Sequence, residues 1–341
     1  MSSEQLPPSP QPPAEVVPVE DVAHPLEGLW LPMGPPPERI RFQHNYKLHI
    51  ALFLVTLFTT TFASNQVLEY LYLWLGGAVQ AGPHPLTLFL DPHIIISGLM
   101  FSAPLLIILS AHEFGHYVAC RIHKVDATLP YYLPLPLPPT GTLGAVIRIK
   151  EAFPSKRALF DIGVAGPIAG FVMLLPFLYW GVTLSTVAPA AHGPGVIEFG
   201  EPLLFKAIAW MHFGPIPPGS EVFLHPTGFA GWWGMLATAL NLMPFGQLDG
   251  GHIVYSLLGR RSSYVSIATV GVAMLLTLRS MSWISVTVMM LIMAFFLGVR
   301  HPRIRDEETP LDGVRRLVAV CALVIFVLCF TPVPIQTFFG K

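Results

Sequence analysis

The chain has 341 residues, of which 53% are hydrophobic and only 11% are charged, and its mean hydropathy is +0.60. This composition is typical of a polytopic, all-α membrane protein and argues against a soluble domain. A net charge of −1 offers no basic surface to a polyanion, so we expect no nucleic-acid partner. The cysteines lie in apolar runs, which indicates buried thiols without disulfides or a thiolate metal site: Cys120, Cys321 and Cys329.

The N-terminal segment differs in composition from the rest of the chain. Residues 1–37 contain 11 prolines among serine, glutamine and glutamate, which favours disorder. We therefore expect a Pro-rich, disordered cytoplasmic tail over residues 1–40 and a single integral-membrane domain over residues 41–341. No basic segment followed by a short apolar run opens the chain, so we expect no cleaved signal peptide.

Apolar runs in the remaining chain predict about seven transmembrane helices. The expected spans are 48–63, 94–122, 159–185, 230–254, 264–278, 283–299 and 317–330, and a short apolar segment at 67–75 is expected to lie in the interface. The two runs within 264–299 are short, so a full spanning hairpin there is left open. In this scheme 16 of the 19 Lys and Arg residues fall on one side of the membrane. The positive-inside bias then predicts a multi-pass protein of the cytoplasmic (inner) membrane with its N-terminus in the cytoplasm.

The second expected span carries the sequence His-Glu-Phe-Gly-His at 112–116. On a helix, His112 and His116 project from one face about 40° and about 6 Å apart, which suits two ligands of one tetrahedral metal ion. In a zinc hydrolase, Glu113 between them would be the general base that takes a proton from the attacking water. Two histidines and a glutamate are costly inside a membrane without partners, which favours a functional site.

The segment after this span, residues 125–157, is basic and contains a run of prolines followed by Thr140-Gly-Thr-Leu-Gly144. The prolines exclude a helix, and residues 145–150 have strand character. We predict a β-hairpin or re-entrant loop that dips toward the metal, since irregular backbone at membrane depth needs protein or a wet cavity beside it. A plain cytoplasmic loop is the alternative.

A later apolar stretch, residues 230–254, contains the sequence Leu-Asp-Gly-Gly-His at 248–252. Pro244 and the neighbouring glycines should break the helix there, so that Asp249 turns inward at the depth of the two histidines and supplies a third ligand. Alternatively, Asp249 is a turn residue in an Asp-Gly-Gly bend. His252 is an alternative ligand or a residue beside the site. Between the two motifs, Gly163, Gly166 and Gly170 are expected to allow close helix packing.

The two motifs together resemble the site-2 protease family of intramembrane zinc metalloproteases. The resemblance rests on His-Glu-Phe-Gly-His, on Asn241-x-x-Pro-x-x-x-Leu-Asp-Gly-Gly-His252, and on Gly-Pro-Ile-Ala-Gly at 166–170. It covers about residues 95–260, the expected catalytic core. The Gly141-Thr-Leu-Gly144 and Gly231-Trp-Trp-Gly234 stretches and the lack of an inserted PDZ domain are most similar to the plastid and cyanobacterial ethylene-dependent gravitropism-deficient yellow-green type, in which Arg often stands where this chain has His252.

The resemblance implies one zinc ion per chain held by His112, His116 and Asp249, with Glu113 as base and acid. It also implies cleavage of single-span membrane proteins within or near their transmembrane helices, for regulated intramembrane proteolysis or remnant clearance. Asn241, about 80° from Asp249 on a continuous helix, is implied in substrate or oxyanion binding, with an interhelical polar contact as the alternative. Beside Gly141 and Gly144, the hairpin is expected to accept substrate as an added strand.

Three rival functions are weighed against this interpretation. A non-proteolytic metal-binding scaffold or an ion transporter would also place His and Asp inside a membrane. Glu113 argues against both, because neither needs a base beside the metal. A membrane zinc protease acting on prenylated or soluble tails would use a glutamate as third ligand in a Glu-x-x-x-Asp context, which the sequence lacks.

Overall fold

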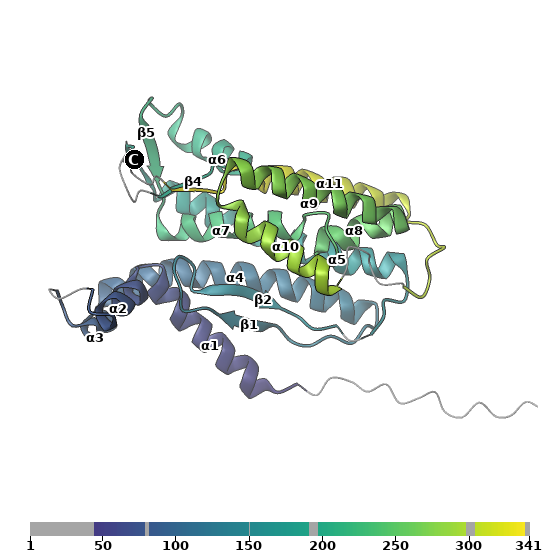
Figure 1. The fold of residues 1–341 in the computed structure, drawn as a ribbon, viewed down its shortest axis with the longest axis horizontal. Helices are drawn as coiled ribbons and strands as arrows, with labels where there is room; N and C mark the ends of the chain where they lie inside the picture. The colour runs from purple at the N-terminus through teal and green to yellow at the C-terminus, as the bar shows by residue number, and fades with distance from the viewer. Residues whose placement is uncertain (1–43, 79–81, 150, 191–196, 298–303, 338–341) are drawn as a thin grey trace, which may run out of the picture. The chain divides into compact units, whose positions relative to one another are not determined.

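The computed structural model describes residues 44–78, 82–149, 151–190, 197–297 and 304–337 (Figure 1). These residues belong to one structural unit that begins at Phe42. The predicted tail at residues 1–40 lies outside the described residues, and so do Arg300 and Arg303 of the basic segment before the last expected span.

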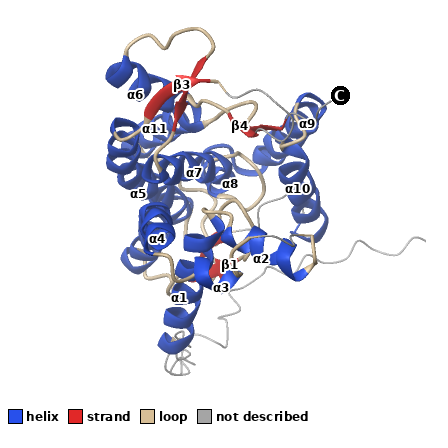
Figure 2. Ribbon diagram, turned by 90° about the vertical axis from the view of Figure 1, so that its left-hand side faces the viewer, coloured by secondary structure: helices blue, strands red, loops and turns tan. Residues whose placement is uncertain are grey.

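Helices make up most of the described chain, as the composition predicts (Figure 2). Four stretches are long and apolar enough to cross a membrane, namely Tyr46–Ala63, Pro92–Ile122, Lys156–Thr183 and Asp249–Arg279. This indicates a multi-pass membrane protein, while the number seven stays a prediction. The helices are α1 Tyr46–Ala63, α2 Val67–Leu75, α3 Pro85–Leu88, α4 Pro92–Ile122, α5 Lys156–Thr183, α6 Leu203–Phe213, α7 Pro226–Asn241, α8 Asp249–Leu258, α9 Ser262–Arg279, α10 Trp283–Leu297 and α11 Gly313–Cys329.

Helices α4, α5 and α7 pack against one another and form the centre of the fold. Their ends follow from local sequence, because Asp91 and Ser155 cap the N-termini of α4 and α5 with their side-chain oxygens. The buried core between them is apolar and includes Ile108, Leu174, Leu178, Trp232 and Met235. This packing fixes α4, which carries the His-Glu-x-x-His motif, against the two helices that face it.

A β-hairpin lies beside α1 and α4 (Figure 1). Strand β1 (Tyr131–Pro134) pairs antiparallel with β2 (Thr142–Val146), with Tyr132 opposite Ala145. The hairpin predicted from the proline-rich segment is therefore present, although β2 begins at Thr142, earlier than the expected strand at 145–150. The proline run itself supplies β1, which is possible because a two-stranded sheet leaves each strand one edge without ladder bonds.

Hydrogen bonds fasten this hairpin to both neighbouring helices. The Nδ1 atom of His49 in α1 lies 3.0 Å from the carbonyl oxygen of Pro130, and the Thr59 hydroxyl donates to the carbonyl of Gly141 at 2.7 Å. On the α4 side, the hydroxyls of Tyr132 and Ser110 are 2.6 Å apart. Ser110 lies two residues before His112, so the hairpin is anchored directly next to the motif.

One end of the helix bundle is held by charged side chains, and we call it the His123 end. His123, at the C-terminus of α4, contacts Asp161 in α5 at 2.9 Å, and Arg315 in α11 donates two hydrogen bonds to the same carboxylate at 2.6 and 2.8 Å. Arg315 also pairs with Asp312, the N-cap of α11. The backbone N–H of Arg315 hydrogen-bonds the Asp312 carboxylate and lowers its pKa.

The other end carries two small sheets, and we call it the β4 end. Strand β3 (Thr186–Pro189) pairs with β5 (Ser220–Phe223), and β4 (Ile197–Phe199) pairs with β6 (Ile335–Thr337). The turn between α9 and α10 lies at this end too, because the Trp283 indole donates to the carbonyl of Pro332 at 2.8 Å. Segments far apart in sequence therefore meet at each end.

Candidate metal centre

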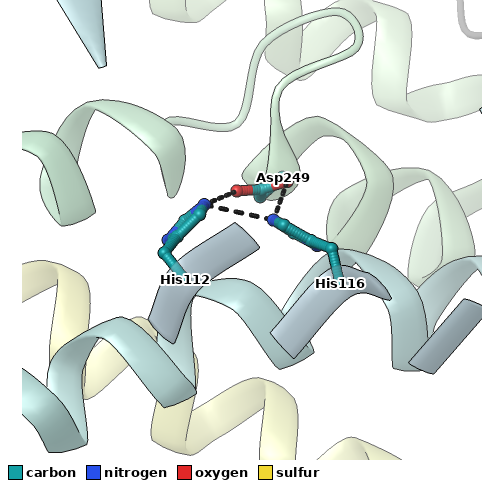
Figure 3. A group of neighbouring side chains, drawn as sticks. All are labelled: His112, His116 and Asp249. Atoms are coloured by element: carbon teal, nitrogen blue, oxygen red, sulfur yellow. Dashed lines mark hydrogen bonds and ion pairs between the residues drawn. The ribbon is translucent and has the colours of Figure 1, made fainter. Parts of the chain in front are cut away.

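Three side chains from two helices converge inside the bundle (Figure 3). His112 and His116 project from α4, and Asp249 is the first residue of α8. The two Nε2 atoms are 3.1 Å apart, and they lie 3.2 and 3.3 Å from the two Asp249 carboxylate oxygens. Both histidines are 7% exposed. The His-Glu-x-x-His motif and the Leu-Asp-Gly-Gly-His motif therefore lie next to each other in the structure.

The donor set fits a tetrahedral zinc ion. Ligand atoms bound at about 2.0–2.1 Å to one tetrahedral ion lie roughly 3.3–3.4 Å from one another. The two Nε2 atoms are 3.1 Å apart, each lies 3.2 or 3.3 Å from a different Asp249 oxygen, and one ligand atom from each residue lies within 4.8 Å of the other two. Lone pairs that face one another without a cation would repel, because carboxylate oxygens and deprotonated ring nitrogens only accept hydrogen bonds. These three residues therefore form a group able to hold a metal ion.

A backbone carbonyl sets the orientation of one ring. The Nδ1 atom of His116 lies 2.7 Å from the carbonyl oxygen of Ile162 in α5. A carbonyl only accepts, so Nδ1 carries the hydrogen, and in the neutral ring Nε2 then keeps its lone pair directed at the cluster. A hydrogen bond from the far ring nitrogen to a carbonyl is the usual support of a metal-binding histidine. The sequence gives no sign of Ile162, because the contact is made by its backbone.

The break between α7 and α8 brings Asp249 to the histidines. Helix α7 ends at Asn241, residues 242–248 are irregular, and α8 starts at Asp249, as Pro244 and the glycines predicted. The estimate of an 80° helical offset between Asn241 and Asp249 was wrong, since no continuous helix joins them. Instead, the break lets the Asn241 amide nitrogen come within 3.2 Å of His112 Nε2.

Helix α9 supports this irregular segment through side-chain hydroxyls. The backbone N–H of Gly246 donates to the Ser266 hydroxyl at 3.2 Å, and the Thr269 hydroxyl donates to the carbonyl of Pro244 at 3.2 Å. The intervening Phe245 is fully buried. Freed backbone groups at membrane depth need such partners. Ser266 and Thr269 were missed by sequence analysis, because nothing in the α9 sequence marks which residues face the break.

Two cavities flank Glu113, which is 7% exposed and accepts a hydrogen bond from the backbone of Ile147. Cavity A, of about 250 Å³, lies toward α8 and is lined by His112, Glu113, His116, Ala145, Val146, Ile147, Ile149, Phe153, Ile162, Asn241, Gln247, Leu248, Asp249 and His252. Cavity B, of about 230 Å³, lies between α4, β2 and α7 and is lined by Ile108, Leu109, His112, Glu113, Leu143, Gly144, Ala145, Val146, Gly170, Gly234, Ala237, Thr238, Leu240 and Asn241. Both cavities therefore meet at the motif and at β2.

The remaining sequence-predicted site residues lie at different distances from this centre. Gly144, at φ +103°, lines cavity B. Gly141, at φ +75°, instead lies against the backbone of Thr59 and Thr60 in α1, where no side chain would fit. His252 lines cavity A beside Phe153, with ring centroids 5.7 Å apart, and lies outside the three-residue metal group.

The glycines of α5 face the histidines rather than only another helix. A methyl group on Gly166 would overlap the His116 imidazole at Nε2, and one on Gly170 would press on His112. Their spacing was expected to serve helix packing, which is part of their use. The structure adds that these positions leave room for the ligand rings themselves.

We expect Gly166→Ala to lower zinc affinity on the order of 10- to 100-fold, because His116 must rotate away from the cluster. Metal content after dialysis against a graded chelator series measures the change. Gly271→Ala in α9, where no heavy atom lies within 4 Å of the added methyl, is the matched control. Equal zinc affinity in both variants would contradict the placement of the His116 ring.

Residues 100–278 match the model of Peptidase family M50, which is more than half of the chain. The match includes His112, His116 and Asp249, the group that could hold a metal ion, so the class defined here is a peptidase family with a candidate metal site. The chain belongs to Peptidase family M50, and the predicted membership of the site-2 protease family is confirmed.

The chain is also similar to curated plant proteins. It is 30% identical over 225 residues to "Probable zinc metalloprotease EGY1, chloroplastic" of Oryza sativa subsp. japonica, covering 63% of this chain and 38% of the relative. It is 34% identical over 161 residues to the Arabidopsis thaliana EGY1 protein, covering 46% and 29%. With "Probable zinc metalloprotease EGY2, chloroplastic" of Arabidopsis thaliana it shares 28% identity over 261 residues, covering 73% and 44%. The chain thus spans less than half the length of these relatives, and no solved structure matches it.

Proposed function

We propose that this protein is an intramembrane zinc endopeptidase that cleaves transmembrane segments of single-span membrane proteins. The observation that carries the proposal is the buried group of His112, His116 and Asp249 with Glu113 beside it, within helices apolar enough to span a membrane. Membership of Peptidase family M50 and the similarity to proteins named zinc metalloproteases support the same conclusion. Hydrolysis at such a metal group needs space for water and substrate beside it, and cavities A and B both border His112 and Glu113.

In this mechanism His112, His116 and Asp249 would hold the zinc ion, which supplies a Lewis acid that makes water a nucleophile near neutral pH. Glu113 takes the proton from the attacking water and passes it to the leaving amine. Its place between the two cavities puts its carboxylate next to any peptide bond that crosses from one cavity to the other.

Asn241 is proposed to bind the carbonyl oxygen on which negative charge develops. Its amide nitrogen is 3.2 Å from His112 Nε2 and lines both cavities. We expect Asn241→Ala to lower kcat by about 10²-fold with little change in KM, since one donor to a developing oxyanion is lost. Steady-state kinetics on a cleavable reporter measure this. An unchanged kcat would assign Asn241 to helix contact alone.

Strand β2 is proposed to bind the substrate backbone. It is paired on one edge with β1, and its residues 143–146 line cavity B. An extended peptide added along the other edge would pass Glu113, and unwinding a substrate helix to this form exposes its peptide bonds. Val146→Pro, with Val146→Ala as control, is expected to stop cleavage while zinc content stays constant. Cleavage by the proline variant at the control rate would count against strand addition.

We further propose seven spans, a cytoplasmic N-terminus and a location in the cytoplasmic membrane. Two observations support this topology. Segments that the sequence places on the cytoplasmic side contact one another at the His123 end, through His123, Asp161 and Arg315. Segments that it places on the opposite side contact one another at the β4 end, through the β4–β6 pair and the Trp283–Pro332 hydrogen bond. Cysteines placed singly at Met281 and Glu308 in a cysteine-free chain should react with an impermeant reagent from opposite sides. Labelling of both from one side would contradict this topology.

The direct test of activity uses the purified full chain with zinc in liposomes that contain a single-span reporter protein. The proposal predicts a new terminus within the reporter's transmembrane segment, lost after chelation and restored by zinc. A zinc-loaded chain that binds the reporter without cutting it would favour the metal-dependent scaffold.

A further inference from the structure

One face of α7 leads to Asn241 and carries small side chains, and Leu240 adds one large apolar side chain to the same wall of cavity B. Gly234, Ala237 and Thr238 lie seven, four and three residues before Asn241, so the four residues share a helix face. All four line cavity B. The Thr238 hydroxyl donates to the carbonyl of Gly234 at 2.8 Å, so it turns back to its own helix and leaves its methyl group available to the cavity wall.

The opposite walls of cavity B are apolar except where they reach the motif. Ile108 and Leu109 of α4 line the cavity, with Ile108 packed on Gly234 of α7, and Gly170 of α5 lines it without a side chain. The volume of about 230 Å³ exceeds the roughly 150 Å³ of an apolar cavity that admits benzene, so a leucine or phenylalanine side chain fits. Cavity A has Gln247 and His252 in its wall as well, and the balance of polar and apolar lining is similar in the two cavities.

We infer that cavity B is a specificity pocket that takes the bulky apolar side chain of the substrate residue beside the scissile bond, and that Ala237 sets its size. This inference rests on the proposed protease function. The pocket shares His112, Glu113 and Asn241 with cavity A, so a side chain seated in it holds its own peptide group at Glu113. The substrate class is therefore a transmembrane segment with a Leu-sized or Phe-sized residue next to the scissile bond.

The test compares reporters that differ at one residue next to the mapped cut, with Ala, Val, Leu or Phe there. The full-length zinc-loaded chain in liposomes should cleave the Leu and Phe reporters on the order of 10-fold faster than the Ala reporter. Ala237→Phe should reverse this order, and Ala237→Val should reject only Phe. Ala103→Phe, the same change at an exposed position of α4 away from both cavities, should leave the order as in the wild type.

Zinc content and cleavage together separate the outcomes. If the wild type cuts none of the reporters, the proposed function fails, and this inference with it. If it cuts them and both Ala237 variants keep zinc and the wild-type order, the inference is overturned while the function stands. Should Ala237→Phe lose zinc, the smaller Ala237→Val variant decides, because its order must move toward small residues. Mass spectrometry of the new termini verifies that the cut position is the same throughout.

Discussion

Glu113→Gln is expected to abolish proteolysis while the protein keeps its zinc. Glutamine has the shape of glutamate but cannot accept a proton, and loss of a positioned general base costs about 10²–10⁴-fold in rate. Glu113 is no part of the His-His-Asp group, so metal binding should be unchanged. Single-turnover cleavage of the transmembrane reporter, with metal content measured on the same sample, gives both values.

The control for this variant is Glu221→Gln in β5 at the β4 end, a residue that lines neither cavity. It makes the same chemical change and should leave the rate as in the wild type. Cleavage by Glu113→Gln within a few-fold of this control would exclude Glu113 as the base and reopen the scaffold and transporter functions. Loss of zinc from Glu113→Gln would instead place the residue among the metal ligands.

Asp249→Ala is expected to lose zinc without losing membrane insertion. Its carboxylate oxygens lie 3.2 Å from His112 Nε2 and 3.3 Å from His116 Nε2, so the variant leaves two histidines without an anionic partner. Removing even a supporting residue of a zinc ligand costs 10- to 100-fold in affinity, and removing a ligand should cost on the order of 10²-fold or more. Metal content after dialysis and the membrane-bound fraction after alkaline extraction are the two measurements.

His252→Ala distinguishes the two ligand assignments open from sequence. His252 lines cavity A but lies outside the metal group, so we expect this variant to keep its zinc. If Asp249→Ala keeps full zinc occupancy and His252→Ala loses its zinc, the third ligand is His252 and not Asp249. If both variants keep full zinc occupancy, His112 and His116 suffice to hold the ion.

Local sequence signals predicted most helices within a few residues. The short helix α2 has the bounds expected for residues 67–75, and the break near Pro244 separates α7 from α8. Such features depend on apolar runs, prolines and caps, which act over neighbouring residues. Pairing of β4 with β6 was not expected, because it joins residues about 140 positions apart that carry no shared pattern.

The part of the candidate site that consists of metal-binding side chains could be predicted from the sequence. His112, His116 and Asp249 were expected together, and they meet. The supports of the site were not predictable, because they act through backbone or through the absence of a side chain. In α5, the Ile162 carbonyl accepts a hydrogen bond from the His116 ring, and Gly166 leaves room for that ring. Both roles depend on how α5 is rotated about its axis. Likewise, the position of Gly141 against α1 rather than in a cavity follows from hairpin docking.

The central claim is tested most directly by N-terminal proteomics of cells that carry either the wild-type chain or Glu113→Gln. The account predicts new protein termini inside transmembrane segments only with the wild type, accumulation of the intact precursors with the variant, and a bulky apolar residue next to each cut. Matching terminus profiles under several stresses, with zinc bound in both proteins, would contradict the assignment as an intramembrane protease.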